Sequence, residues 1–295
     1  MAPVPFFGLE ATHNPHRWYL PVVPELCTWH EFLFGGCGLG AAIEALERTS
    51  GRPLVWATAQ YLSYARPGSV MDLDVTVPVA GRSVTQARAV GHVGDTEILT
   101  VNAALGERRL SVPGQFVEMP DVPPPDECDD RPTRFDDDRD TIMRRIELRL
   151  ARGRGHGEFD GVPLPDGRSA LWARIRDLPE TTAAKLGVLG DYVPFGIGQA
   201  LGRFVGGNSL DNTLRVVRLV PSEWILVDVA VHAVDRGFGH GLVHLWAEDG
   251  TLLATASQST IAREWSDPPT PPDDDPTSGG ATSGGATSGD PASGD

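Results

Sequence analysis

The feature that most constrains the fold of this 295-residue chain is an internal repeat with an offset of 154 residues. No gap is needed between residues 36 and 105, and the aligned positions include Gly36-Cys37 with Gly190-Asp191, Pro67 with Pro221, Asp74-Val75 with Asp228-Val229, Arg82 with Arg236, Asp95 with Asp249 and Leu99 with Leu253. Self-similarity at a fixed period indicates two copies of one supersecondary unit. Cys37 aligns with Asp191 and Ala104 with Gln258, so we expect the chemistry in the second copy.

Each copy has the same order of predicted elements, an apolar helical segment followed by strands that turn signals separate. The predicted helical segments are 34–48 and 182–204, and the predicted strands are 18–23, 54–65, 69–79, 82–92 and 97–106 in the first copy and 146–151, 170–175, 210–219, 223–234, 237–247 and 251–262 in the second. Between residues 183 and 201 only Lys185 and Asp191 are charged, and a helix that is apolar all round is buried. We therefore predict an α+β fold in which a curved antiparallel sheet wraps around a central helix.

Two segments account for most of the net charge of −15. Residues 119–140 combine prolines with nine acids and three arginines, and residues 267–295 hold six acids and no base, so each segment carries −6 and only −3 remains elsewhere. These compositions predict an extended connector and a disordered tail. We divide the chain into a domain at 1–118, a linker at 119–140, a domain with the candidate residues at 141–265 and a tail at 266–295.

Composition also excludes several classes of partner and location. The sequence has no basic stripe, which argues against a nucleic-acid partner. No stretch approaches the ~18 apolar residues of a membrane-spanning helix, and the N-terminus does not have the pattern of a signal peptide. Cys27, Cys37 and Cys128 have no metal-ligand spacing and fit a reducing compartment, so we expect a cytoplasmic protein.

The histidines do not form a ligand pattern. His240 and His244 are four residues apart on one face of a predicted strand, and His232 is close to them in sequence. A protein zinc site needs at least three ligands, and the sequence offers no further one here. We interpret these residues as surface or edge histidines and expect neither a metal nor a cofactor.

Asp191 is the strongest candidate for chemistry because its neighbours Leu189, Val193 and Phe195 are apolar. An ionised carboxylate in apolar surroundings is costly unless it is paired, and burial raises its pKa. These properties suit a general base. The residues alone leave a structural role open, because Asp191 followed by Pro194 also suits the N-cap of a restarting helix.

Gln258 and Ser209 are the other candidates. Gln258 lies on the apolar face of the last predicted strand, where its amide is suited to hold a water or a substrate carbonyl, or to bond the backbone of the core. Ser209 follows Gly206-Gly207 at the entry to a strand, where its hydroxyl is suited to orient a water or to cap the turn. Asp211 is a rival carboxylate in the same segment.

Several motifs, in their order and spacing, resemble the acyl-CoA thioesterase II family over roughly residues 15–265. Besides a proline-rich connector, these motifs are Phe34-Gly35-Gly36, Arg66-Pro67-Gly68, Gly190-Asp191, Ser209-Leu210-Asp211-Asn212-Thr213, Ser222-Glu223-Trp224-Ile225-Leu226 and the late strand with Gln258. By position, the family's catalytic Asp falls on Asp191, its Thr on Ser209 and its Gln on Gln258. Ser209 keeps the hydroxyl of the family's Thr. Cys37 replaces a Gln frequent in the family, a change that bears on acyl-group preference.

The resemblance implies two fused hotdog domains and a function in lipid and fatty-acid metabolism, the hydrolysis of acyl-CoA thioesters without a covalent intermediate. Asp191 would activate a water that Gln258 and Ser209 position. The backbone amides of Gly206-Gly207 are candidates to bind the thioester oxygen. Arg215 or Arg236 is a candidate to bind the phosphates of CoA.

Three alternatives stay open at this point. Cys37 begins a helix, where a thiol can have a lowered pKa and act as a nucleophile, although no orienting His accompanies it. A non-hydrolytic hotdog protein that binds acyl-CoA or a polyketide-like ligand would share the fold. A hydratase would need a His on a central helix, which neither predicted helix contains. The expected partner is an acyl-CoA substrate, and the assembly is either a monomer or a homo-oligomer.

Overall fold

The described residues form thirteen strands and a few helices. In this computed structural model, they are residues 5–109, 112–130, 139–155 and 158–264, so the predicted tail and part of the predicted linker lie outside them. The strands of the N-terminal half (residues 5–109) are β1 (Glu10–Ala11), β2 (Arg17–Pro21), β3 (Leu54–Tyr61), β4 (Val70–Ala80), β5 (Val84–Val93) and β6 (Thr96–Gly106). Those of the C-terminal half (residues 139–264) are β7 (Ile146–Arg152), β8 (Arg168–Ile175), β9 (Val205–Ser209), β10 (Asp211–Val216), β11 (Ile225–Asp235), β12 (Phe238–Ala247) and β13 (Leu252–Glu264).

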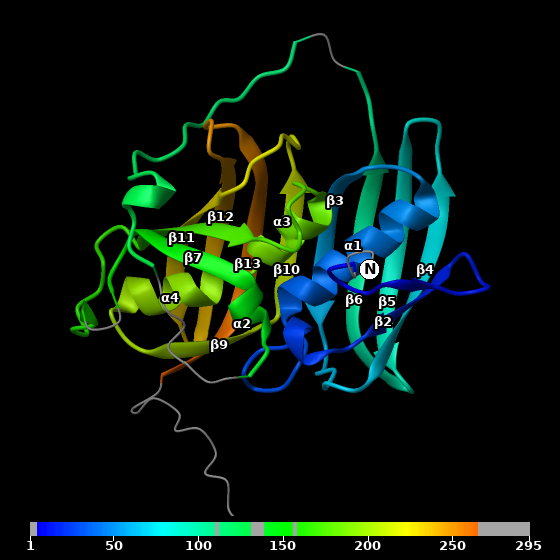
Figure 1. Ribbon diagram of the computed structural model, residues 1–295, viewed down its shortest axis with the longest axis horizontal. Helices are drawn as coiled ribbons and strands as arrows, with labels where there is room; N and C mark the ends of the chain where they lie inside the picture. The colour runs from blue at the N-terminus through cyan, green and yellow to red at the C-terminus, as the bar shows by residue number, and fades with distance from the viewer. Residues whose placement is uncertain (1–4, 110–111, 131–138, 156–157, 265–295) are drawn as a thin grey trace, which may run out of the picture.

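All the strands belong to one antiparallel sheet whose order confirms the internal repeat. The order is β1-β2-β4-β5-β6-β3-β10-β13-β12-β11-β8-β7, with β9 paired to β13 (Figure 1). Outward from the central pair, β3, β6, β5, β4 and β2 therefore mirror β10, β13, β12, β11 and β8. Every predicted strand is present with its ends within four residues of the prediction, whereas β1 and β9 were not predicted.

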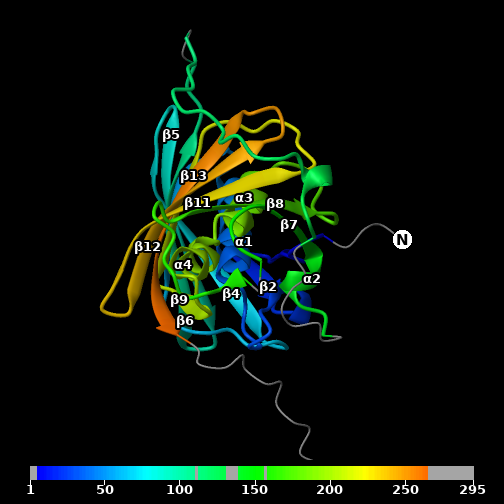
Figure 2. The same cartoon turned by 90° about the vertical axis from the view of Figure 1, so that its left-hand side faces the viewer.

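The helices α1, α3 and α4 pack on one face of this sheet, here called the interior face (Figure 2). The helix α1 (Gly35–Ser50) contacts strands β3 to β6. In the C-terminal half, α3 (Ala183–Leu189) packs on α1, and α4 (Val193–Leu201) contacts β8, β9 and β11 to β13. Short helices η1 (Pro24–Leu26), η2 (Pro125–Glu127) and α2 (Ile142–Arg145) lie in the connections. A buried helix against each half of the sheet agrees with the predicted α+β arrangement.

The single helix predicted over 182–204 is wrong, because the chain breaks it between α3 and α4. Gly190 ends α3, and Tyr192 has a non-helical backbone with φ −120° and ψ 6°. Pro194 then stands in the first turn of α4. In an unbroken helix its ring would clash with the carbonyl four residues earlier, at Gly190. The break therefore follows from a proline whose position the sequence already contained.

The gap-free alignment is also wrong by one residue in two strands. Thr58 and Thr213 pair with each other at the β3–β10 junction and are therefore counterparts. Thr58 also pairs with Asn102, and Thr213 with Ser257, so Asn102 is the counterpart of Ser257. The structural counterpart of Gln258 is therefore Ala103, with an offset of 155, and not Ala104. In β13 the cause is a longer turn: two residues separate Val93 from Thr96, whereas three separate Ala247 from Thr251.

The predicted connector is extended but packs against the C-terminal half. Met119, Val122 and Cys128 cover an apolar cluster on the outer face of the sheet, whose members are Ala170, Trp172, Trp224, Leu226, Trp246 and Leu252. The backbone carbonyl of Pro123 accepts a hydrogen bond from Trp172 Nε1 at 2.9 Å. Sequence composition predicted only an extended connector here, and three tryptophans on the outer face give these connector residues an apolar surface to cover.

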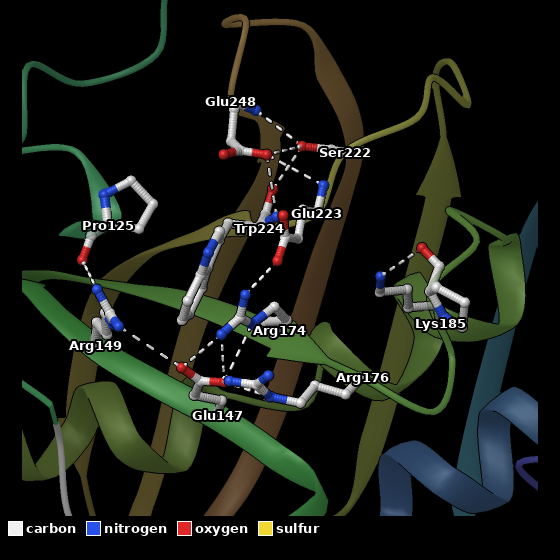
Figure 3. A network of polar contacts seen from close by, with 11 residues as sticks. Pro125, Glu147, Arg149, Arg174, Arg176, Lys185, Ser222, Glu223, Trp224 and Glu248 are labelled. Atoms are coloured by element: carbon white, nitrogen blue, oxygen red, sulfur yellow. Dashed lines mark hydrogen bonds and ion pairs between the residues drawn. The ribbon is translucent and has the colours of Figure 1, made fainter.

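A polar network fastens the connector and the neighbouring strands on that outer face (Figure 3). Arg149 donates to the carbonyl of Pro125, and both Arg149 and Arg174 stack on Trp224, with guanidinium-to-ring distances of 4.9 and 4.4 Å. Glu147 accepts hydrogen bonds from Arg174 at 2.8 to 3.1 Å. These charges are largely paired with one another, so we assign this network a structural role.

Candidate active site

Asp191 lies between α3 and α4 and points at the first turn of α1 from the other half. Its Oδ2 accepts a hydrogen bond from the backbone N–H of Gly36 at 2.7 Å. No side chain of α1 itself caps this helix, whose N-cap residue is Phe34. The N-cap of α4 is Tyr192, so the interpretation of Asp191 as the cap of its own restarting helix is wrong. A carboxylate at a helix N-terminus is favoured by the free N–H groups and the helix dipole.

The other carboxylate oxygen, Oδ1, accepts hydrogen bonds from two side chains. Ser209 Oγ donates at 3.0 Å, and Gln258 Nε2 donates to the same oxygen. Gln258 Nε2 also donates to Ser209 Oγ at 2.6 Å, while Gln258 Oε1 accepts from the backbone N–H of Val193 at 3.2 Å. The structure thus brings together all three candidate residues of the sequence analysis in one hydrogen-bonded group.

Burial and hydrogen bonding act on the pKa of Asp191 in opposite directions. The residue is 5% exposed, and its desolvation raises the pKa from 3.8 to about 6 in spite of the donors Gln258, Ser209 and Gly36, which lower it. A carboxylate has about four acceptor sites, and these donors occupy three of them. The carboxylate is therefore held in place with one acceptor site left, and its pKa is raised to about 6.

The elements that carry the three residues explain why they meet. Ser209 ends β9, and Thr260 of β13 is its cross-strand partner. Gln258 lies on the same strand two residues earlier, and successive side chains of a strand alternate between its faces. Gln258 is 3% exposed and faces the interior, as the alternation of the sequence predicted.

Two glycines at the start of α1 contact the Asp191 carboxylate or the helix beside it, which the sequence did not predict. A Cβ at Gly35 would lie 2.7 Å from Asp191 Oδ2, and one at Gly36 would lie 2.7 Å from the carbonyl oxygen of Val188. Gly35 therefore permits the carboxylate to approach, and Gly36 supplies the N–H while α1 contacts α3. The Phe-Gly-Gly motif in the sequence marked these two glycines. Why glycine is needed there became evident only from the contacts with the C-terminal half.

Asp191 and Ser209 line a cavity of about 790 Å³ between the two halves. Aromatic side chains from both halves form much of its wall, namely Trp29, His30, Phe32, Phe34, Tyr61, Tyr64, Phe159, Tyr192, Phe195 and Phe204. Gln258 does not line the cavity and reaches it only through Asp191 and Ser209. The cavity places an apolar space beside an ionisable carboxylate.

Cys37 does not support the nucleophile alternative. Its side chain is fully buried, burial raises the pKa of its thiol well above the ordinary value, and it is not part of the cavity wall. The thiolate is the nucleophilic form of cysteine, so this environment suppresses the reactivity that the alternative requires. The rival carboxylate Asp211 accepts the backbone N–H of Ser259 at 2.8 Å and is also absent from the cavity wall.

Arg215 and Arg236, the arginines suggested for contacts with the CoA phosphates, do not line the cavity, and their role stays a prediction. Arg215 is exposed on β10, and Arg236 lies in the β11–β12 turn with its side chain 87% exposed. The arginines that line the cavity are Arg66, Arg203 and Arg263. Gly206 and Gly207 do line it, next to Ser209.

His232, His240 and His244, the histidines considered as metal ligands, lie apart from this cavity. His240 Nδ1 is 3.1 Å from Ser259 Oγ, and His244 Nδ1 is 4.0 Å from Asp228 Oδ2. Within the described residues, no three His, Cys, Asp or Glu side chains gather closely enough to hold a metal ion. None of the helices in that part of the chain has the length and apolar character needed to cross a membrane.

Comparisons with known proteins agree with the family resemblance of the sequence. A family model described as the acyl-CoA thioesterase C-terminal domain matches residues 125–262. A solved structure described as a thioesterase from Novosphingobium aromaticivorans is 35% identical, with a TM-score of 0.77 over 86% of this chain and 97% of that chain. No curated protein matches the chain in sequence.

Two further solved structures are similar in fold. A conserved protein with a hot dog fold from Alicyclobacillus acidocaldarius is 20% identical, with a TM-score of 0.75 over 89% of this chain and 98% of that chain. An acyl-CoA thioesterase II from Mycobacterium marinum is 19% identical, with a TM-score of 0.68 over 88% and 96% of the two chains. At these identities the likeness concerns the fold alone.

Proposed function

The chain belongs to the acyl-CoA thioesterase family and is a thioester hydrolase, and from this premise we propose that Asp191 activates the hydrolytic water. The observation that carries the proposal is the Asp191 carboxylate itself, which is held by three donors, has a pKa of about 6 and lies at an apolar cavity. A general base works best when its pKa is near the operating pH. The proposed substrates are acyl-CoA thioesters.

In the proposed reaction, Asp191 accepts a proton from water as the water oxygen attacks the thioester carbonyl carbon. The tetrahedral intermediate then collapses, the carbon–sulfur bond breaks, and the proton returns to the leaving thiolate. Ser209 lies at the cavity and helps to orient the water, whereas Gln258 holds the carboxylate and the hydroxyl from behind. Gly206 and Gly207 line the same cavity, which keeps their N–H groups candidates for the carbonyl oxygen.

The proposed architecture is a double hotdog, with one module at 1–118 and the other at 141–265, joined by the linker at 119–140. The mirrored strand order and one buried helix against each half support it. The acyl group would occupy the aromatic-lined space between the modules. A cytoplasmic role in lipid metabolism follows from the resemblance and stays a prediction, as does any homo-oligomer.

The decisive experiment is Asp191→Asn, assayed with acetyl-, hexanoyl- and palmitoyl-CoA by release of free thiol. Loss of the general base should lower the rate by about 10³-fold or more, with the fold retained. Circular dichroism and binding of a non-hydrolysable acyl-CoA analogue are the controls. A variant as fast as the parent would overturn the assignment of the base. A parent that binds the analogue but releases no thiol from any substrate would favour the non-hydrolytic alternative.

A further inference from the structure

We propose that Asn212 is a positioning residue of the same site, acting through the amide of Gln258; this inference rests on the proposed function. Asn212 is 0% exposed, and neither its Oδ1 nor its Nδ2 has a hydrogen-bond partner among the described residues. Most buried side-chain amides in proteins are hydrogen-bonded, because an unpaired buried amide lowers stability. An amide kept at this position calls for a reason other than stability.

The sheet register places Asn212 beside Gln258 on the interior face. Thr213 of β10 pairs with Ser257 of β13, so the residues next to them, Asn212 and Gln258, are cross-strand neighbours. Leu214, two residues along β10, lies on the same face as Asn212 and packs near Gly190, which immediately precedes Asp191. Side chains of directly opposite residues have Cβ atoms only about 5 Å apart, so two amides there are within reach of each other.

The other half of the molecule shows that the scaffold does not need an amide at this place. Ala59 pairs with Asn212 and Ala57 with Leu214, so the counterpart of Asn212 under the internal symmetry is Ala57. The counterpart of Gln258 is Ala103. Cys37 is likewise the counterpart of Asp191 in the internal repeat. All three interior positions are therefore small or apolar in the N-terminal half and polar in the C-terminal half. The polar replacements are neighbours, which indicates that they serve one site.

The inferred role is to fix the orientation of the Gln258 amide. Gln258 must present Nε2 to Asp191, since the reversed amide would set Oε1 against the carboxylate. Among the described residues, its Oε1 accepts only the N–H of Val193, at 3.2 Å, and it has a second lone pair. The register sets Asn212 opposite Gln258, and although no hydrogen bond joins the two amides in this structure, a donation from Asn212 Nδ2 to that lone pair during turnover would hold Nε2 toward Asp191.

The test compares Asn212→Ala with Thr213→Val, which changes the adjacent residue on the opposite face and removes its hydrogen bond to Thr58. Asn212→Ala should lower kcat by on the order of tenfold with KM nearly unchanged, because positioning is lost but binding is not. Its melting temperature should equal or exceed that of the parent, because alanine already occupies the counterpart position 57. Thr213→Val should show the reverse, a lower melting temperature and an unchanged kcat.

A double-mutant cycle tests whether Asn212 acts through Gln258. In a Gln258→Ala background, Asn212→Ala should cause no further loss of kcat, because residues that act as one unit are not additive. If Asn212→Ala unfolds the protein, Asn212→Leu is used in both measurements instead, because leucine fills the side-chain volume. An active parent whose Asn212 variants keep full kcat would overturn this inference alone. A parent with no hydrolytic activity would overturn the proposed function as well.

Discussion

The two halves of this molecule share one architecture but treat the same interior positions in opposite ways. In the N-terminal half, Cys37, Ala57 and Ala103 are buried and apolar or small. In the C-terminal half, the counterparts Asp191, Asn212 and Gln258 are equally buried and polar. The difference shows that the fold itself is satisfied by apolar packing at these positions. We therefore propose that the polar set serves the chemistry of one half and not the stability of the fold.

The two helix starts show the same contrast. The first turn of α1 has no cap of its own and receives the carboxylate of Asp191 from the other half. The first turn of α4 instead has Pro194, which lacks an N–H to be satisfied, and its Val193 N–H bonds to Gln258. A site between the halves thus depends on both: one supplies the acid group and the other the N–H that holds it.

The largest effect among the following changes is expected at the start of α1. Gly35→Ala should lower kcat by about 10³-fold, because its Cβ would lie 2.7 Å from Asp191 Oδ2 and displace the carboxylate from the Gly36 N–H. Thiol-release kinetics measure the loss. The matched control is Gly38→Ala, whose Cβ meets a flexible leucine side chain, Leu99, and not the carboxylate. Equal losses in both variants would mean that helix packing, not the approach of Asp191, sets the activity.

Gln258→Ala should have the next largest effect. It gives the C-terminal half the alanine that the N-terminal half has at position 103, and it removes the donor to both Asp191 and Ser209. We expect kcat to fall on the order of 10²-fold, as for other positioned hydrogen-bond donors. Ser257→Ala, one residue away on the opposite face, should retain the parent rate. A Gln258→Ala enzyme with parental kinetics would remove Gln258 from the proposed site.

The pH dependence should report the buried carboxylate. Because burial raises the pKa of Asp191 to about 6, kcat/KM should be full above that pH and fall about tenfold per unit below it, as the base is protonated. The contribution of Asp191 to the free energy of unfolding has the opposite pH dependence. It stabilises the fold below its ordinary pKa of 3.8, and this stabilisation is lost as pH rises through about 6. The residual rate of Asp191→Asn should lack this acid limb. A parent profile flat from pH 7 to 4.5 would contradict the base assignment.

The smallest effect is expected at the counterpart of Asp191. Cys37→Ala should change kcat by less than about twofold, because the thiol is fully buried with a raised pKa and lies outside the cavity wall. The same thiol-release assay measures it, and alkylation of the folded parent should be slow. A Cys37→Ala enzyme without activity would revive the nucleophile alternative and break the contrast between the halves.

Much of the architecture could be predicted from the sequence, because hydrophobic patterning is local. The alternation around Ala254, Ala256 and Gln258 predicted a strand with an amide on its buried face, and that is where the residue lies. The apolar segment around Asp191 predicted burial. The family's motifs then brought Asp191, Ser209 and Gln258 together as candidates, and the structure places them in hydrogen-bonding contact.

Long-range contacts decided the rest, since no pattern along one segment records its partner. The break at Gly190 could be read in the sequence only by weighing Pro194 against a long apolar run. The one-residue longer turn at Glu248-Asp249-Gly250 shifts β13, and a shift of one residue moves a side chain to the other face of a sheet. That shift replaced Ala104 by Ala103 as the counterpart of Gln258.

The sequence by itself determined the repeat, most of the strands, the first central helix and the carboxylate that an apolar segment would bury, because each depends on the order of neighbouring residues. Only the tertiary structure decided that Asp191 bonds to the first turn of α1, that Gly35 makes room for it, and that Asn212 lies next to Gln258. These relations join segments more than 40 residues apart, as the Asp191–Gly36 separation of 155 residues illustrates. Packing of the two halves, and not local propensity, sets them.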